Sequence, residues 1–200
     1  MKTIGSVEEL TELYPAAAAR SLTKVTPHIS PLYRRWIEAS RFVVLATVGP
    51  EGCDASPRGD TENLVKLPDS RTIWLPDWRG NNRLDSLTNI VRDPRVSLMF
   101  MVHGSNNVVR VIGDAVLTAD PEVTREFRHS DKLPRTVVVV SVKEVYFQCA
   151  KALMRSDLWN SSSAAAGLPT AGDFLREQEA GFDAESYDAG YDEYARERMW

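Results

Sequence analysis

The sequence has few cysteines, no long apolar run and no excess of positive charge. Cys53 and Cys149 are its only cysteines, and neither belongs to a CxxC motif, so a disulfide framework is excluded. No stretch approaches the ~18–20 apolar residues of a membrane span. The first residues also lack an apolar run of signal-peptide length. We therefore expect a cytoplasmic protein with reduced thiols and no membrane partner.

The charge balance and the missing motifs exclude further classes. Lysine and arginine number 24 and aspartate and glutamate 28, so the formal net charge is −4. Nucleic-acid binding usually needs a basic face, so no nucleic-acid partner is expected. There is no P-loop, no G-x-S-x-G elbow and no G-x-G-x-x-G after a strand. The three histidines are scattered, so neither a metal site nor a catalytic triad is predicted. Chemistry carried by a bound cofactor fits better.

Strand-like segments dominate the middle of the chain. Apolar and β-branched runs predict strands at 42–48, 53–56, 72–75, 96–102, 107–117 and 136–147. Gly49–Gly52 predicts a hairpin turn between the first two, and Pro76 is expected to end the third. Gly113 predicts a bulge or a barrel bend. This order is typical of a closed or nearly closed antiparallel barrel rather than of βαβ units.

Helices are expected around this barrel. Ser30–Pro31 predicts a helix start, and the expected buried side of this helix is Leu32, Trp36 and Ile37. A helix is also predicted over 82–92, capped by Asn82. Its expected apolar positions are Leu84, Leu87 and Val91. Residues 160–167 predict a flexible or extended connector, and two acidic amphipathic helices follow it.

The chain therefore divides into three parts. Residues 1–40 form an N-terminal helical segment and residues 41–159 the barrel domain. Residues 160–200 form a C-terminal helical extension, which is expected to pack on the barrel or on a partner chain.

The segment Trp74–Arg83 indicates a ligand site. A strand ends there, a Gly/Asn turn follows, and a helix begins with Arg79 and Arg83 flanking its cap. Helix N-termini offer unpaired N–H groups and a positive dipole end, which suit anions. Two guanidinium groups can grip phosphate oxygens bidentately. A phosphate monoester therefore fits this segment, and a capped surface helix with solvated arginines is the alternative.

Two other segments carry candidate residues. In Ser56–Asp60 an arginine beside a glycine brings charge and backbone N–H groups toward a flat ligand, unless the segment is an ordinary hairpin exit. After the longest strand, Lys151 and Arg155 are four apart and share a helix face that suits an anion. Cys149 has no histidine nearby in sequence to activate it, so a buried structural cysteine is the favoured interpretation.

Together these segments resemble the pyridoxamine 5′-phosphate oxidase-like flavoproteins. The similarity is greatest to a bacterial subgroup of FMN-dependent enzymes that shares the tail pattern Leu168–Asp173. The resemblance implies a mainly β fold with flanking helices, a six-stranded antiparallel split β-barrel that binds FMN. It also implies a homodimer with FMN at the subunit interface.

The resemblance assigns cofactor-binding residues by position. Arg79, Asn82 and Arg83 would hold the FMN phosphate. The isoalloxazine ring and the ribityl chain would run along Arg58, Gly59, Asp60, Leu75, Pro76 and Asp77. Met101 would meet the flavin from a middle strand. Across the dimer interface the flavin would meet Gln148, Cys149 and Lys151.

The activity implied is that of an FMN-dependent oxidoreductase, which passes a hydride or electrons through flavin N5 to a small substrate. NADH or NADPH would reduce the flavin, and no catalytic side chain is assigned. The family's arginine-rich C-terminal motif is absent from the acidic segment Tyr187–Trp200, so oxidation of vitamin B6 is not inherited. The alternatives are a flavin-binding sensor or storage protein without turnover, a relative that binds deazaflavin or haem, and a flavin-free dimeric interaction module.

Overall fold

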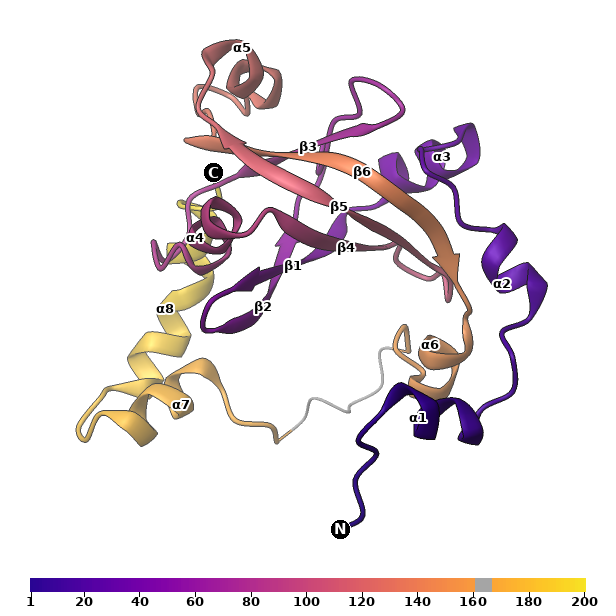
Figure 1. Ribbon diagram of the computed structural model, residues 1–200. Helices are drawn as coiled ribbons and strands as arrows, with labels where there is room; N and C mark the ends of the chain where they lie inside the picture. The colour runs from indigo at the N-terminus through magenta and orange to yellow at the C-terminus, as the bar shows by residue number, and fades with distance from the viewer. Residues whose placement is uncertain (161–166) are drawn as a thin grey trace.

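A single curled antiparallel sheet forms the centre of the computed structural model, which describes residues 1–160 and 167–200 (Figure 1). Its strands lie in the order β2-β1-β4-β5-β6-β3. Their bounds are β1 (Phe42–Gly49), β2 (Gly52–Gly59), β3 (Thr72–Asp77), β4 (Arg95–Met101), β5 (Val108–Thr118) and β6 (Thr136–Gln148). The predicted six-stranded antiparallel barrel with flanking helices is confirmed, and β2 and β3 are the two edges at which the barrel is split.

Helices precede, interrupt and follow this sheet. Before it lie α1 (Val7–Leu13), α2 (Ala19–Thr23) and α3 (Pro31–Ala39). Between strands lie α4 (Asp85–Arg92), α5 (Pro121–Thr124) and the 3₁₀ turn η1 (Arg125–Phe127). After it come α6 (Lys151–Ser156), α7 (Ala171–Gln178) and α8 (Ala184–Arg196). None of the helices described is long and apolar enough to cross a membrane. Most of the predicted connector, residues 161–166, lies outside the described part of the chain.

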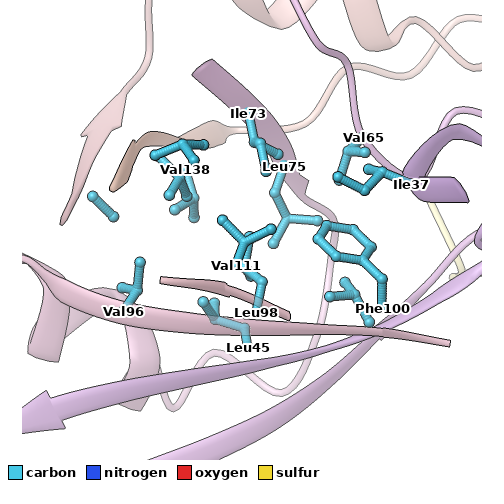
Figure 2. Packing of buried hydrophobic residues seen from close by; sticks show 14 of the residues in the cluster. Ile37, Leu45, Val65, Ile73, Leu75, Val96, Leu98, Phe100, Val111 and Val138 are labelled. Carbon is cyan, nitrogen blue, oxygen red and sulfur yellow. The ribbon is translucent and has the colours of Figure 1, made fainter. Parts of the chain in front are cut away.

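The core fills the inside of the curled sheet. Side chains alternate along the strands, so that in β1 Val43, Leu45 and Thr47 are buried and their neighbours are more exposed. Figure 2 shows residues from β1, β3, β4, β5 and β6 packed together, with Ile37 of α3 closing one side. Phe100 of β4 is fully buried in this cluster. The sheet is therefore held by one continuous apolar core.

The two edge strands each contain a proline. Pro57 lies in β2 and Pro76 in β3. The prediction that Pro76 ends its strand was wrong, because β3 continues to Asp77 and Pro76 pairs with Val137 of β6. A proline lacks the N–H that a second neighbouring strand would need, but an edge strand has no such neighbour. Prolines at both edges also disfavour pairing with the edge strand of another chain.

Two predicted helix faces differ from the structure. In α3 the N-cap Ser30 and the first residue Pro31 are confirmed, but Leu32 is 74% exposed whereas Ile37 is buried. The helix predicted over 82–92 begins at Asp85, because Leu84 takes a left-handed backbone conformation with φ of 61°. Of the predicted apolar positions, Leu87 packs against the core, whereas Leu84 and Val91 are exposed. The buried side chains of α4 are Ser86 and Ile90.

Gly113 marks the irregularity in the longest strand pair, as predicted. The register between β5 and β6 shifts at Ile112/Gly113. A Cβ atom on Gly113 would lie 2.3 Å from the carbonyl oxygen of Ser141 and 3.1 Å from Cγ1 of Val140. Because the first of these neighbours is backbone within a paired strand, it has little freedom to move.

We expect Gly113→Ala to lower the free energy of unfolding by about 1–3 kcal/mol, since the added methyl group overpacks the strand pair. The matched control is Gly190→Ala in α8, where an added Cβ meets nothing within 4 Å. Alanine favours a helix over glycine by about 0.8–1.0 kcal/mol, so the control is expected to stabilise the protein. Urea unfolding midpoints measure both changes, and equal effects of the two variants would contradict the close contact at Gly113.

Candidate functional site

A groove of about 1270 Å³ opens between the two edges of the sheet. It is lined by β2, the end of β3, the loop that leads to α4 and the loop that leads to β6. The groove contains the predicted residues Arg58, Gly59, Asp60, Leu75, Pro76, Asp77, Arg79, Asn82 and Arg83. Segments far apart in the sequence thus meet here because the sheet curls until β2 approaches β3.

An ion pair joins the two edges across the groove. Nη1 of Arg58 on β2 lies 2.5 Å from Oδ1 of Asp77 on β3. Both side chains are largely buried, with 20% and 18% of their surface exposed. Removing one partner of a buried pair leaves the other charge uncompensated, which is strongly destabilising. The pair therefore orients both side chains at the floor of the groove.

Three buried polar atoms of the groove residues lack a hydrogen-bond partner within the described part of the chain. They are Nε of Arg58, Nε1 of Trp78 and Oγ1 of Thr136. Leaving such a group unpaired costs about 1–3 kcal/mol, so native proteins rarely do so without a reason. All three groups can donate a hydrogen bond. The groove therefore offers buried donors for the acceptor atoms of a ligand.

The loop before α4 places two arginines at one end of the groove. Arg79, Asn82 and Arg83 are all exposed. Nε of Arg83 lies 2.8 Å from Oδ2 of Asp85, and such an exposed pair contributes only about 0.2–1 kcal/mol, so a phosphate can displace it. The predicted cap was wrong, because Leu84 and not Asn82 is the N-cap and it supplies no side-chain acceptor. The first N–H groups of α4 are thus free of a side-chain cap.

Asp93 holds the opposite end of α4. Its carboxylate accepts hydrogen bonds from the guanidinium of Arg95 at 2.6 Å and from the backbone N–H of Arg95 at 3.0 Å. These bonds lower the pKa of Asp93 from 3.8 to about 2. Because the folded pKa lies below the ordinary value, the stabilisation is present above the ordinary pKa and is lost as the pH falls through about 2. At neutral pH Asp93 is therefore ionised and can keep its hydrogen bonds to Arg95.

Four predicted residues do not line the groove of their own chain. Met101 ends β4, where it pairs with Phe42 and Val108. The others follow one another at the end of β6 opposite to Thr136: Gln148, Cys149 and Lys151. Cys149 is exposed on this chain, so the interpretation as a buried structural cysteine was wrong. The predicted route by which the last three reach a flavin, across a dimer interface, stays a prediction.

Sequence reasoning missed several groove residues. Trp78 directly follows Asp77, the last residue of β3, and Thr136, the first residue of β6, pairs with Asp77. Both positions lie at strand ends, where ligand-binding residues can be sought from the sequence. The loop before β6 contributes Lys132 and Arg135. Met199 and Trp200 also line the groove, and nothing in the sequence near them indicates this.

No metal centre is seen in the described residues, since no three histidine, cysteine, aspartate or glutamate side chains lie close enough together to hold an ion.

Comparison with protein-family models identifies one family. Residues 29–149, more than half of the chain, match the family model described as Pyridoxamine 5′-phosphate oxidase. No curated protein matches the chain.

Among solved structures, the chain is similar to a HupZ variant from Group A Streptococcus, with 17% identity, coverage of 60% of this chain and 99% of that chain, and a TM-score of 0.49. It is also similar to a proposed pyridoxamine 5′-phosphate oxidase from Lactobacillus delbrueckii (21% identity, 60% and 95% coverage, TM-score 0.47). An FMN-binding protein from Syntrophomonas wolfei is a further match (12% identity, 58% and 88% coverage, TM-score 0.44). Similarities this distant say nothing about which ligand the groove of this chain takes.

Proposed function

Because this chain belongs to the pyridoxamine 5′-phosphate oxidase family, we propose that its groove binds FMN and that it acts as an FMN-dependent oxidoreductase. The observation that carries the proposal is the presence of three unpartnered buried donors beside an arginine-bearing loop, all in one groove between the sheet edges. A flat heterocycle rich in acceptor atoms, attached to a phosphate, matches that arrangement.

The phosphate would lie at the loop before α4. Arg79 and Arg83 supply two planar guanidinium groups there, and two such groups match the charge of about −2 on a phosphate monoester. Asn82 adds an amide donor. The uncapped N–H groups at the start of α4 favour an anion at the same point.

The ring would lie over the floor made by the ends of β2 and β3. Leu75 and Pro76 are buried and lie at the edge of the groove, where they would form the apolar base beneath a flat ring. Nε of Arg58 and Nε1 of Trp78 are buried donors that the carbonyl oxygens and ring nitrogens of an isoalloxazine would satisfy. The Arg58–Asp77 ion pair keeps the first of these donors in place. Gly59 and Asp60 would line the ribityl chain and the ring edge.

A second copy of the chain would complete the site. Met101, Gln148, Cys149 and Lys151 lie away from the groove of their own chain, so their proposed contacts require a homodimer with FMN at its interface. Lys151 and Arg155 lie on α6 and are exposed, which leaves both available to meet an anion from another subunit.

The flavin, when bound, supplies transfer of a hydride or electrons through N5, from NADH or NADPH to a small acceptor. The chain's own residues then bind and orient the reactants and exclude water from them. No acid or base in the groove is required by this proposal, so its rate depends on positioning.

The test is the absorbance spectrum of the protein purified without added cofactor, followed by mass spectrometry of the molecule that heat releases. Oxidised-flavin bands and the mass of FMN support the proposal. A colourless protein that does not take up added FMN contradicts it, and the mass of a deazaflavin or a haem names a different cofactor. Repeated reduction by NADH or NADPH with an acceptor present supports an enzyme, whereas a flavin that stays oxidised indicates a sensor or storage protein.

A further inference from the structure

Trp200 lies in the groove and is held there on two sides. Its indole N–H donates a hydrogen bond to Oδ2 of Asp60 at 3.3 Å. One face of the indole stacks on the imidazole of His129, with ring centroids 4.1 Å apart and planes 13° from parallel. The rest of the half-buried side chain lines the groove. The indole is thus an oriented flat surface in the same groove as the proposed cofactor site.

The segment that carries Trp200 reaches the groove from α8. In Figure 1 the yellow α8 runs toward the sheet and the end of the chain lies near β3. Nζ of Lys132 donates to the carbonyl oxygen of Glu197 at 3.4 Å, and the guanidinium of Arg198 lies 4.1 Å from the ring centre of Tyr194. The first contact joins the segment to the loop before β6, and the second lies within the segment itself. Trp200 is not among the residues of the apolar core. Packing of the core therefore does not account for its position.

Two cations line the groove that holds the indole. They are Lys132 and Arg135, on the loop before β6. In the described part of the chain, Arg58 and Arg83 of the groove pair with carboxylates, whereas no ion pair involves Lys132 or Arg135. Both side chains are exposed, so their charges are available to an anion that enters the groove.

The groove is larger than a typical site for one small molecule. Sites for a single small molecule usually measure about 300–1,000 Å³, and this groove measures about 1270 Å³. With a cofactor phosphate at Arg79 and Arg83, the loop before β6 and Trp200 remain for a second ligand.

We propose that Trp200, Lys132 and Arg135 form the substrate subsite of this groove and select a planar, negatively charged molecule. The substrate ring stacks on the indole, and its anionic group faces the two cations. Trp200 is the specificity-determining residue, because Asp60 and His129 hold its ring before any ligand arrives and so reduce the entropy lost on stacking. This inference rests on the proposed function, in which FMN occupies the other part of the groove.

The test uses the FMN-loaded protein and three probes. 2-Naphthoate is planar and anionic, 2-naphthalenemethanol is planar and neutral, and cyclohexanecarboxylate is anionic and not planar. Calorimetry gives each Kd, and the shift of the flavin absorbance bands reports contact with the ring. We expect 2-naphthoate to bind about tenfold more tightly than either comparison compound, since each of these lacks one of the two interactions.

Variants separate the two interactions. Trp200→Leu is expected to weaken 2-naphthoate about fivefold to tenfold, and Trp200→Phe, which keeps a flat ring, recovers most of that loss. Arg135→Gln is expected to weaken 2-naphthoate about tenfold and to leave 2-naphthalenemethanol unchanged. Arg71→Gln, which removes a charge outside the groove, serves as the matched control. In the Arg135→Gln and Arg71→Gln variants the Kd of FMN is expected to stay within about twofold, because neither side chain belongs to the proposed phosphate site.

The inference is overturned if 2-naphthoate binds no better than the comparison compounds, or if Trp200→Leu leaves its Kd unchanged. Tighter FMN binding in Trp200→Leu also overturns it, because Trp200 would then occupy the cofactor's own place. If the protein takes up no FMN, the proposed function is contradicted. The subsite is then tested by itself, by calorimetry of 2-naphthoate binding to the FMN-free protein. The subsite is supported if 2-naphthoate binds to the FMN-free protein and Trp200→Leu weakens that binding. It is rejected if 2-naphthoate does not bind.

Discussion

Replacing Arg79 and Arg83 together with alanine is expected to weaken FMN binding by about 3–6 kcal/mol, at least a hundredfold in Kd, because hydrogen bonds to charged groups contribute about 1.5–3 kcal/mol each. Both side chains are exposed on the groove loop, so the protein loses little stability when they are shortened. Fluorescence titration of free FMN with each purified variant gives the Kd.

The control for charge is the double variant Arg71→Ala, Arg92→Ala, which removes two exposed arginines that do not line the groove. It is expected to leave the Kd within about twofold, since neither side chain lines the groove and water and salt screen exposed charges that make no direct contact. Arg79→Lys with Arg83→Lys should give intermediate affinity, because lysine keeps the charge but not the bidentate fork. An unchanged Kd in the folded double alanine variant would place the phosphate elsewhere.

Phe100→Ala is expected to lower the free energy of unfolding by about 3–5 kcal/mol, the usual cost of removing a buried phenylalanine ring. Phe100 has no exposed surface and lies in the cluster that joins β4 to the other strands (Figure 2). Losing it would leave a cavity at the centre of the sheet. Since a domain is stabilised by only about 5–15 kcal/mol, the variant is expected to be marginally folded in urea titrations at room temperature.

Leu32→Ala is the matched control for this core prediction. Leu32 is an apolar residue of α3 that is 74% exposed, and exposed substitutions usually change stability by less than about 0.5 kcal/mol. A large loss of unfolding free energy in Leu32→Ala, or a small one in Phe100→Ala, would contradict this packing. The helix and the sheet would then pack through other residues.

Much of the sheet was predictable because strand formation depends on local patterns. The strand ends agree within a few residues, and the irregularity at Gly113 was identified from a glycine inside an otherwise apolar strand. The misjudged end of β3 had a tertiary cause, because whether Pro76 is tolerated depends on which strands flank it. The start of α4 was predicted too early, because Leu84 has a positive φ. Leucine rarely adopts this backbone conformation, so nothing in the sequence indicates it.

The candidate site was likewise predictable only in part. Arg79 and Arg83 were proposed from a helix start and Arg58 from the family resemblance, and all three line the groove. The partners of these residues were not identified. Arg58 pairs with Asp77, 19 positions away, and Trp200 with Asp60, 140 positions away.

The sequence by itself determined the class of fold, the approximate strands and the arginine-bearing loop, because each depends on residue type and spacing over a short stretch of chain. Only the tertiary structure decided which groups share the groove. Curling of the sheet brings β2 against β3, and α8 brings Trp200 onto His129 and Asp60. Contacts between residues so far apart in the chain form only when the buried core closes the sheet, and no local pattern of residues encodes them.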